Sequence, residues 1–111
     1  MGYMLHHAIV VTCHDLNVLT EAAKKARSFG CVVLGPCDPQ INRVSTMMVC
    51  PDGSKEGWAE SHRGDQNRDR FVGYLNSQRY EDGSTSLEWV EVSYGGDDKS
   101  AQVVRHAWVK E

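Results

Sequence analysis

The sequence has no long apolar run, no Cys-x-x-Cys pair and no excess of basic residues. No stretch approaches the roughly 20 apolar residues that cross a bilayer, which argues against a membrane-spanning helix. The 12 Lys and Arg residues are outnumbered by 15 Asp and Glu residues, and a net negative charge disfavours general binding to nucleic-acid phosphates. The first residues lack a basic segment followed by an apolar one, so we expect no secretion signal and a cytoplasmic protein.

The four cysteines are spread through the first half of the chain: Cys13, Cys31, Cys37 and Cys50. Three of them fall in apolar, strand-like runs, where a free thiol behaves as a small apolar side chain. For a cytosolic chain we expect reduced thiols rather than two disulfides. The histidines show no ligand spacing, so the sequence predicts neither a metal nor a cofactor, although Cys13, His14 and Cys50 would be the group to converge on a metal.

What the chain does contain is an ordinary globular composition, with 41% hydrophobic and 24% charged residues. A length of 111 residues is enough for one core but not two, so a single α/β domain over residues 1–111 is expected. Residues 5–12 are apolar on both faces after two histidines, which is typical of a central strand covered on each side. Residues 16–29 repeat apolar side chains at helical spacing, with Asp15 or Asn17 as the cap and Gly30 as the stop.

The rest of the chain predicts four further strands and a polar helical region. The strands are expected at residues 31–34, 43–50, 87–94 and 101–109, the last two joined as a hairpin. Residues 54–78 predict a helix that starts with Ser54 as its cap. Because Gly64 lies in its middle, the helix is expected to break or bend there and to resume after Asp65 as a second cap.

The predicted element order is β-α-β-β-α-β-β. Its first six elements match the split pattern of a ferredoxin-like two-layer sandwich, with an extra C-terminal hairpin strand. We therefore expect an α+β fold of this ferredoxin-like type. In this interpretation the first and third strands lie side by side and parallel, and each leads into a helix. Their carboxyl ends would then open at one shared edge of the sheet.

The candidate site lies at that edge and depends on the stretch Pro51–Trp58, which joins the third strand to the polar helix. Five polar residues would gather there, namely His14, Asp15, Asp52, Ser54 and Lys55. Ligands in open α/β sheets favour the crevice beyond the strand ends, and helix N-termini attract anions. The sequence therefore predicts a ligand site for an anionic, nucleotide-like small molecule. The alternative is that Asp15, Asp52 and Ser54 serve only as helix caps.

A second candidate is a partner surface on the polar helix, formed by Trp58, Arg63, Arg68 and Arg70. Arginine and aromatic residues are enriched at protein interfaces. The alternative is an ordinary solvated face, which is the usual role of a run of charges. The sequence does not decide between these two interpretations.

Catalysis is an alternative to binding. A small enzyme could use Cys13, His14 and Asp15 on an acyl or phosphoryl substrate, because a helix N-terminus lowers the pKa of a nearby thiol. However, neighbouring residues in a strand point to opposite faces, so Cys13 and His14 cannot easily touch. The sequence favours binding over catalysis.

Three stretches resemble small uncharacterised accessory proteins of tailed phages and prophages. They are His6–Thr12, Pro51–Trp58 and the pair Gly64-Asp65, and the similarity spans about the first two thirds of the chain. The resemblance implies a bacterial cytoplasm and a protein that binds and neutralises a host factor or a signalling molecule, without implying an activity for any residue. We therefore expect a non-enzymatic module that binds an anionic small molecule or a host protein, with a homodimer through an edge strand or the hairpin as one arrangement.

Overall fold

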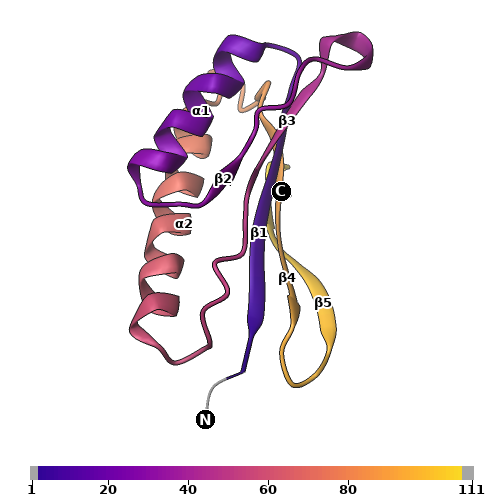
Figure 1. Ribbon diagram of the computed structural model, residues 1–111. Helices are drawn as coiled ribbons and strands as arrows, with labels where there is room; N and C mark the ends of the chain where they lie inside the picture. Colours follow the sequence, from indigo (N-terminus) through magenta and orange to yellow (C-terminus); the bar gives the residue numbers. More distant parts are fainter. Residues whose placement is uncertain (1–2, 109–111) are drawn as a thin grey trace.

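The computed structural model describes residues 3–108, which form one five-stranded sheet and two α-helices (Figure 1). The elements in chain order are β1 (Leu5–Cys13), α1 (Leu16–Ser28), β2 (Val33–Leu34), η1 (a 3-10 turn, Ile41–Arg43), β3 (Ser45–Val49), α2 (Ala59–Ser77), β4 (Glu88–Gly95) and β5 (Ser100–His106). The sheet order is β2-β3-β1-β4-β5, and every pair is antiparallel. The predicted α+β class and element order are confirmed. The last predicted strand reached Val109, which lies outside the described residues.

Helix α1 forms where its sequence pattern predicts it. The Asp15 carboxylate accepts hydrogen bonds from the amides of Asn17 and Val18, at 3.0 and 3.3 Å, and so caps the first turn. Four residues of its apolar stripe are buried, namely Leu19, Ala22, Ala23 and Ala26. Gly30 has a φ of 91°, a left-handed conformation that ends a helix readily only at glycine.

Strands β1 and β3 are neighbours, but they are antiparallel rather than parallel. Cys13 pairs with Ser45 at one rim of the sheet, and Ile9 pairs with Val49 toward the other. The reason is the path of the chain. Because α1 carries the chain back along the sheet, β2 runs in the same direction as β1. The segment between β2 and β3 then reverses the direction of the chain. β3 enters between β1 and β2 with its direction opposed to both. The prediction of parallel neighbours was therefore wrong.

Helix α2 differs from its prediction in two ways. It begins at Ala59 rather than near Ser54, and it runs without a break through Gly64 to Ser77. Its buried residues follow one face, and they change in character along the helix: Ser61, Gly64 and Arg68 come first, followed by Phe71, Val72 and Leu75. The expected break at Gly64, with Asp65 as a second cap, was wrong because Gly64 has a packing role instead.

Both helices cover the same face of the sheet (Figure 1). The core lies between these two layers and is formed by alternate residues of the strands, such as Ile9, Val11, Met47 and Trp89, together with the buried stripe of α1. Within residues 3–108, no helix or loop element covers the opposite face, although β1 is apolar on both sides. Neither helix of this part of the chain has an apolar segment of the length needed to cross a lipid bilayer.

Candidate functional site

The residues predicted to share one edge lie at opposite rims of the sheet. His14 and Asp15 follow the end of β1, whereas Asp52 and Lys55 follow the end of β3. Because β1 and β3 run antiparallel, their carboxyl ends point in opposite directions. The predicted shared mouth does not exist, and the two halves of the proposed site must be considered separately.

At the β1 rim, the polar side chains form a helix start beside an open hollow. The hollow has a volume of about 580 Å³ and is lined by His14, Asp15, Leu16, Asn17, Pro39 and Arg43. The Asp15 carboxylate is already used by the amides of α1. His14 is exposed. For this half of the prediction, the geometry favours the alternative in which Asp15 is a cap.

At the β3 rim, Asp52 and Ser54 form a local turn rather than a cap. One carboxylate oxygen of Asp52 accepts hydrogen bonds from the Ser54 amide at 2.9 Å and from the Ser54 hydroxyl at 2.6 Å. The Ser54 hydroxyl is thus committed to Asp52 and does not reach α2. The helix N-cap is Trp58, which makes no side-chain capping bond within the described residues. The prediction of Ser54 as the cap was wrong.

The carboxylate of Asp52 also packs directly against α2 at Gly64. A Cβ atom added to Gly64 would lie 2.8 Å from Oδ2 of Asp52, which would have to shift, and 3.2 Å from Nη1 of Arg68, which is a tight contact. Burial raises the pKa of Asp52, but the hydrogen bonds from Ser54 and the positive charge of Arg68 lower it by more, so this pKa lies below its ordinary value. Gly64 therefore allows an ionised Asp52 to dock beside Arg68.

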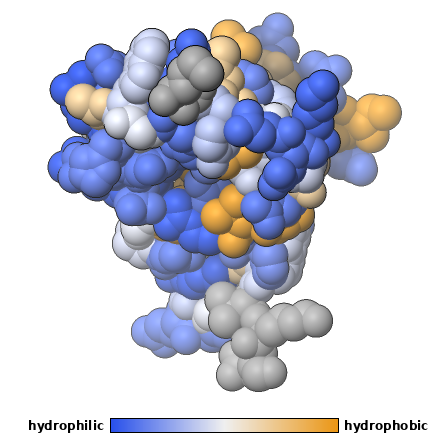
Figure 2. Space-filling view, turned by 90° about the horizontal axis from the view of Figure 1, so that it is seen from below, coloured by the Kyte–Doolittle hydropathy of each residue, from blue (hydrophilic) through white to orange (hydrophobic). Residues whose placement is uncertain are grey.

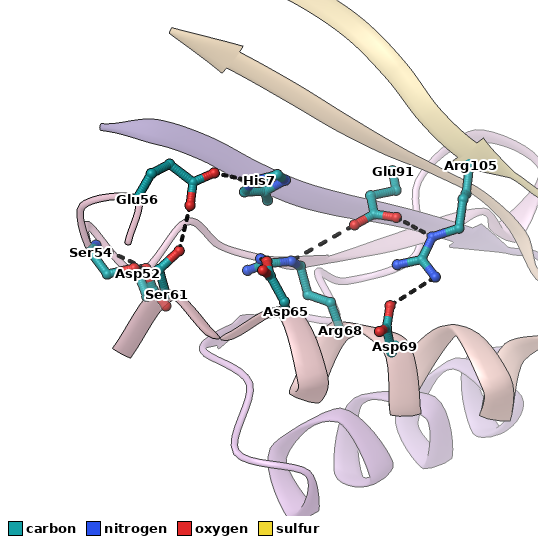
Figure 3. A network of polar contacts seen from close by, with 10 residues as sticks. All are labelled: His7, Asp52, Ser54, Glu56, Ser61, Asp65, Arg68, Asp69, Glu91 and Arg105. Carbon is teal, nitrogen blue, oxygen red and sulfur yellow. Dashed lines mark hydrogen bonds and ion pairs between the residues drawn. The ribbon is translucent and has the colours of Figure 1, made fainter. Parts of the chain in front are cut away.

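Behind this contact lies a network of charges that joins α2 to the sheet, with a buried Arg68–Glu91 pair at its centre (Figure 3). Arg68 is 7% exposed and forms ion pairs with Asp65, one turn earlier, and with Glu91 of β4 at 3.7 Å. Glu91 is 3% exposed and accepts a hydrogen bond from Nε of Arg105 at 2.5 Å. Arg105 in turn contacts Asp69 of α2 at 3.0 Å. Since buried charges are tolerated only when they are paired, these contacts fix where the front of α2 lies.

This network also shows which residues of the predicted partner surface are exposed. Trp58, Arg63 and Arg70 are exposed, as that interpretation requires. Arg68 is not exposed, because its guanidinium turns inward to Glu91. Its assignment to an interaction surface was wrong.

A smaller polar cluster holds the loop before α2 against β1. The Ser61 hydroxyl donates to Oε2 of Glu56 at 2.6 Å, and Oε1 of Glu56 lies 3.6 Å from Nε2 of His7 (Figure 3). The Glu56 amide donates to the carbonyl of Tyr3 at 2.8 Å. In a nucleophilic triad the histidine lies between the hydroxyl and the carboxylate. Here the carboxylate lies in the middle, so the cluster positions the loop and does not activate Ser61.

An open pocket, here called the α2 pocket, lies outside these two clusters at the start of the helix. It has a volume of about 450 Å³ and is lined by Asp52, Gly53, Ser54, Trp58, Glu60, Arg63, Gly64 and Asn67. The Trp58 indole is 50% exposed, and Nζ of Lys55 lies 5.7 Å from its ring centroid. Asp52 and Ser54, from the predicted ligand site, thus meet Trp58 and Arg63, from the predicted partner surface, in one place.

The charges around the α2 pocket are mixed. Lys55 and Arg63 supply positive charge, and Arg63 is only loosely paired with Glu60, at 3.9 Å between exposed side chains. Asp52 supplies an ionised acceptor. The start of α2 adds the partial positive charge of a helix N-terminus. Figure 2 shows this end of the molecule, whose surface is mainly hydrophilic with apolar side chains in small separate patches.

The geometry gives no support to a thiol or metal centre. Cys13 is 1% exposed in the core, and Cys50 lies toward the other rim. Burial raises the pKa of the Cys31 thiol, and the positive charge of Arg68 only partly offsets this rise, so Cys31 is not an activated nucleophile. In the part of the chain that the structure describes, no three His, Cys, Asp or Glu side chains are placed to hold a metal ion.

Sequence reasoning missed the two polar clusters, and in particular Glu91. One signal was available: the alternation in Leu87, Trp89, Glu91 and Ser93 places Glu91 on the same face as two core residues. A charged residue in a core series predicts a buried partner of opposite charge. Nothing local to α2 identifies Arg68 as that partner.

Comparison with known proteins finds no matching family, no matching curated protein and no matching solved structure.

Proposed function

We propose that this protein is a non-enzymatic binding module that holds a small aromatic anion, of the nucleotide kind, in the α2 pocket. The observation that carries the proposal is the half-exposed indole of Trp58. It lines the α2 pocket and lies directly before the first residue of the 19-residue helix α2. A planar base would stack on the indole, since every base has a π-face. The phosphate would lie toward the first turn of α2, near Lys55 and Arg63.

The carboxylate and amide groups of the pocket support the same ligand class. Asp52 is an acceptor and Asn67 is both donor and acceptor, and both line the pocket. A nucleobase carries donor and acceptor groups on its edge, whereas inorganic phosphate would gain nothing from Asp52. The mixed charge of the pocket therefore favours a base joined to a phosphate over a bare anion.

This function agrees with the phage or prophage accessory role that the resemblance implies, in which a bacterial signalling molecule is sequestered unchanged. A ferredoxin-like sandwich is part of the same proposal. The sheet order 2-3-1-4-5 departs from the four-stranded ferredoxin arrangement through β5 at its edge, so the finer class is that of an extended variant. Binding of a host protein is the alternative if no small molecule binds.

The test is a titration of the protein with a panel of nucleotides. Binding is monitored by tryptophan fluorescence and by the melting temperature, and the ligand is recovered afterwards. Trp58→Ala should weaken binding about 5- to 150-fold, which corresponds to a stacking energy of about 1–3 kcal/mol. Trp108→Ala is the matched control, because Trp108 is similarly exposed (59%) but lies away from the pocket. A second pair compares Arg63→Gln, in the pocket, with Arg70→Gln, outside its lining.

Two results would contradict the proposal. If no nucleotide raises the melting temperature, or if both tryptophan variants bind equally, the α2 pocket is not the site. If the recovered ligand has been converted, the protein is an enzyme and the proposal of a non-enzymatic module is wrong.

A further inference from the structure

The uncovered face of the sheet is the largest feature that the α2 pocket leaves unexplained. Its side chains form four rows across the strands, as the pairing partners define them. The rows are Thr46, Thr12 and Glu88; then Leu34, Met48, Val10, Val90 and His106; then Ala8, Val92 and Val103; and last His6, Tyr94 and Ala101. The two middle rows are apolar apart from His106 at the β5 edge, and the two outer rows carry the other polar groups.

A face of this kind needs a cover. Val10 and Val92 are only partly buried by their neighbours in the sheet, and Leu34 and Val103 are 62% and 58% exposed. Monomeric proteins seldom expose contiguous apolar patches of more than a few hundred Å². The central strand β1 is apolar on both sides, yet residues 3–108 place helices on one side only. The sequence of β1 is thus that of a strand with two covered faces.

The size of the face fits a pair of chains. The four rows hold 14 side chains, and with strands about 4.8 Å apart and rows about 6.6 Å apart they cover roughly 450 Å². Two such faces would bury about 900 Å², which is the size of a weak, transient interface. A small ligand could not cover this area.

The order of the rows is self-complementary. Consider a two-fold axis that lies in the plane between two facing sheets and runs across their strands. This axis places the first row of one copy against the last row of the other, and the second row against the third. Apolar rows then meet apolar rows. Glu88, at one end of the face, meets the partner's His6 and Tyr94, which can donate hydrogen bonds to its carboxylate. Two sheets packed in this way keep their strands within about 30° of each other.

We propose that a second copy of this chain covers the open face of the sheet, with the Glu88 end of each copy against the His6 end of the other. This dimer goes beyond the proposed ligand binding and does not depend on it, because the α2 pocket lies on the helix side of the sheet. It also differs from a dimer formed through an edge strand, which would leave the face exposed.

The first test is the mass in solution over a range of concentrations, by light scattering or sedimentation. The mass of the wild-type chain should rise with concentration from its monomer value of 12.4 kDa toward twice that value. Val92→Lys, in the centre of the face, should be monomeric with an unchanged circular dichroism spectrum. Ile41→Lys is the matched control, since Ile41 is 84% exposed in η1 and lies off the face; this variant should remain dimeric.

A charge exchange tests the orientation of the two copies. His6→Glu and Glu88→Lys should each weaken the dimer roughly five- to tenfold, because each removes a complementary contact. The double variant should recover most of the loss, since the carboxylate introduced in one copy would meet the ammonium group introduced in the other. Within one copy these positions are six residues apart along the sheet, about 20 Å. Recovery therefore cannot arise inside a single chain.

Three outcomes would overturn the proposal. The first is a wild-type chain that stays monomeric at high concentration. The second is a Val92→Lys variant that remains dimeric, which would place the contact elsewhere, for instance at the edge strand β5. The third is a double variant that is no tighter than the single ones, which would exclude the stated orientation.

Discussion

The two ends of α2 are held to the sheet in different ways. The rear end buries Phe71, Val72 and Leu75 in the apolar core. The front end buries Gly64 and Arg68 among three carboxylates, which come from the loop before α2, from α2 itself and from β4. Apolar packing is non-directional, whereas ion pairs require particular partners at particular distances. The rear end therefore supplies stability, and the front end supplies a defined position for the α2 pocket.

The largest effect is expected when the buried network loses its central carboxylate. Glu91→Ala leaves Arg68 buried without its partner on the sheet, and we expect a loss of roughly 3–5 kcal/mol in the free energy of unfolding. Phe71→Ala, at the rear end, should lose a similar amount by leaving a cavity. Urea denaturation of both variants, with circular dichroism to follow unfolding, measures the two losses.

The stability lost at the front end of α2 can be restored by a second substitution. If Arg68 and Glu91 are both replaced by methionine, no buried charge is left unpaired, so the double variant should be more stable than Glu91→Ala and close to the wild type. A double variant as unstable as Glu91→Ala would show that the network does not act as a pair. A loss below about 1 kcal/mol for Glu91→Ala would mean that this carboxylate is not buried as described.

A sharper comparison uses two glycines of the same helix. Gly64→Ala should destabilise the protein by roughly 1–3 kcal/mol, because its methyl group would meet Asp52 and Arg68 and push the loop away. Gly73→Ala should instead stabilise it by about 0.5–1 kcal/mol, since nothing lies within 4 Å of the added atom and alanine favours the helix. Thermal unfolding of both variants checks the signs. Equal effects would contradict the close approach of Asp52.

The smallest effect is a dependence on pH, and the chain offers its own control. Asp52-Gly53-Ser54 and Asp82-Gly83-Ser84 form the same turn, with equal hydrogen-bond lengths of 2.9 and 2.6 Å. The pKa of each aspartate lies below its ordinary value: at Asp52 burial opposes the shift, and at Asp82 the hydrogen bonds from Ser84 are the main cause. Only Asp52 also faces Arg68.

The sign of the dependence follows from the lowered pKa. Each aspartate contributes stability that is complete above its unfolded pKa of about 3.9 and is lost as the pH falls through the lower folded value. Arg68→Met should raise the pKa of Asp52 and leave that of Asp82 unchanged. Carboxyl NMR shifts between pH 2 and 6 measure both values. A parallel change at Asp82 would show a general effect of the substitution and not a contact with Arg68.

The parts of the fold that were predicted correctly depend on neighbours in the sequence. Helix α1 carries its cap, stripe and stop within residues 15–30, and the turn that joins β4 to β5, at residues 96–99, lies within one residue of its predicted position. The direction of β3 depends on where β2 returns to the sheet, which no local pattern encodes. Asp52-Gly53-Ser54 was interpreted as a helix start because aspartate turns and helix caps use the same residue types.

The candidate site shows the same limit. Trp58 and Arg63 were singled out for their residue type, and their exposure agrees with that interpretation. Gly64 was taken for a break because a glycine in a polar helix usually weakens it. Its actual neighbour, Asp52, lies twelve positions earlier, and the partner that buries Arg68 lies 23 positions later at Glu91. Contacts of this kind are visible only once the chain is folded.

The pairing of β1 with β4 has a consequence for how the protein is made. β1 occupies the middle of the sheet, and one of its two edges is closed only by β4, with Leu5 opposite Gly95. During synthesis most of the chain must leave the ribosome before this edge is filled. Contacts of such long sequence separation also slow the search for the native state. Until then, one edge of the apolar strand β1 in the nascent protein has no pairing strand. Folding is completed only after residue 95 and its neighbours have been translated.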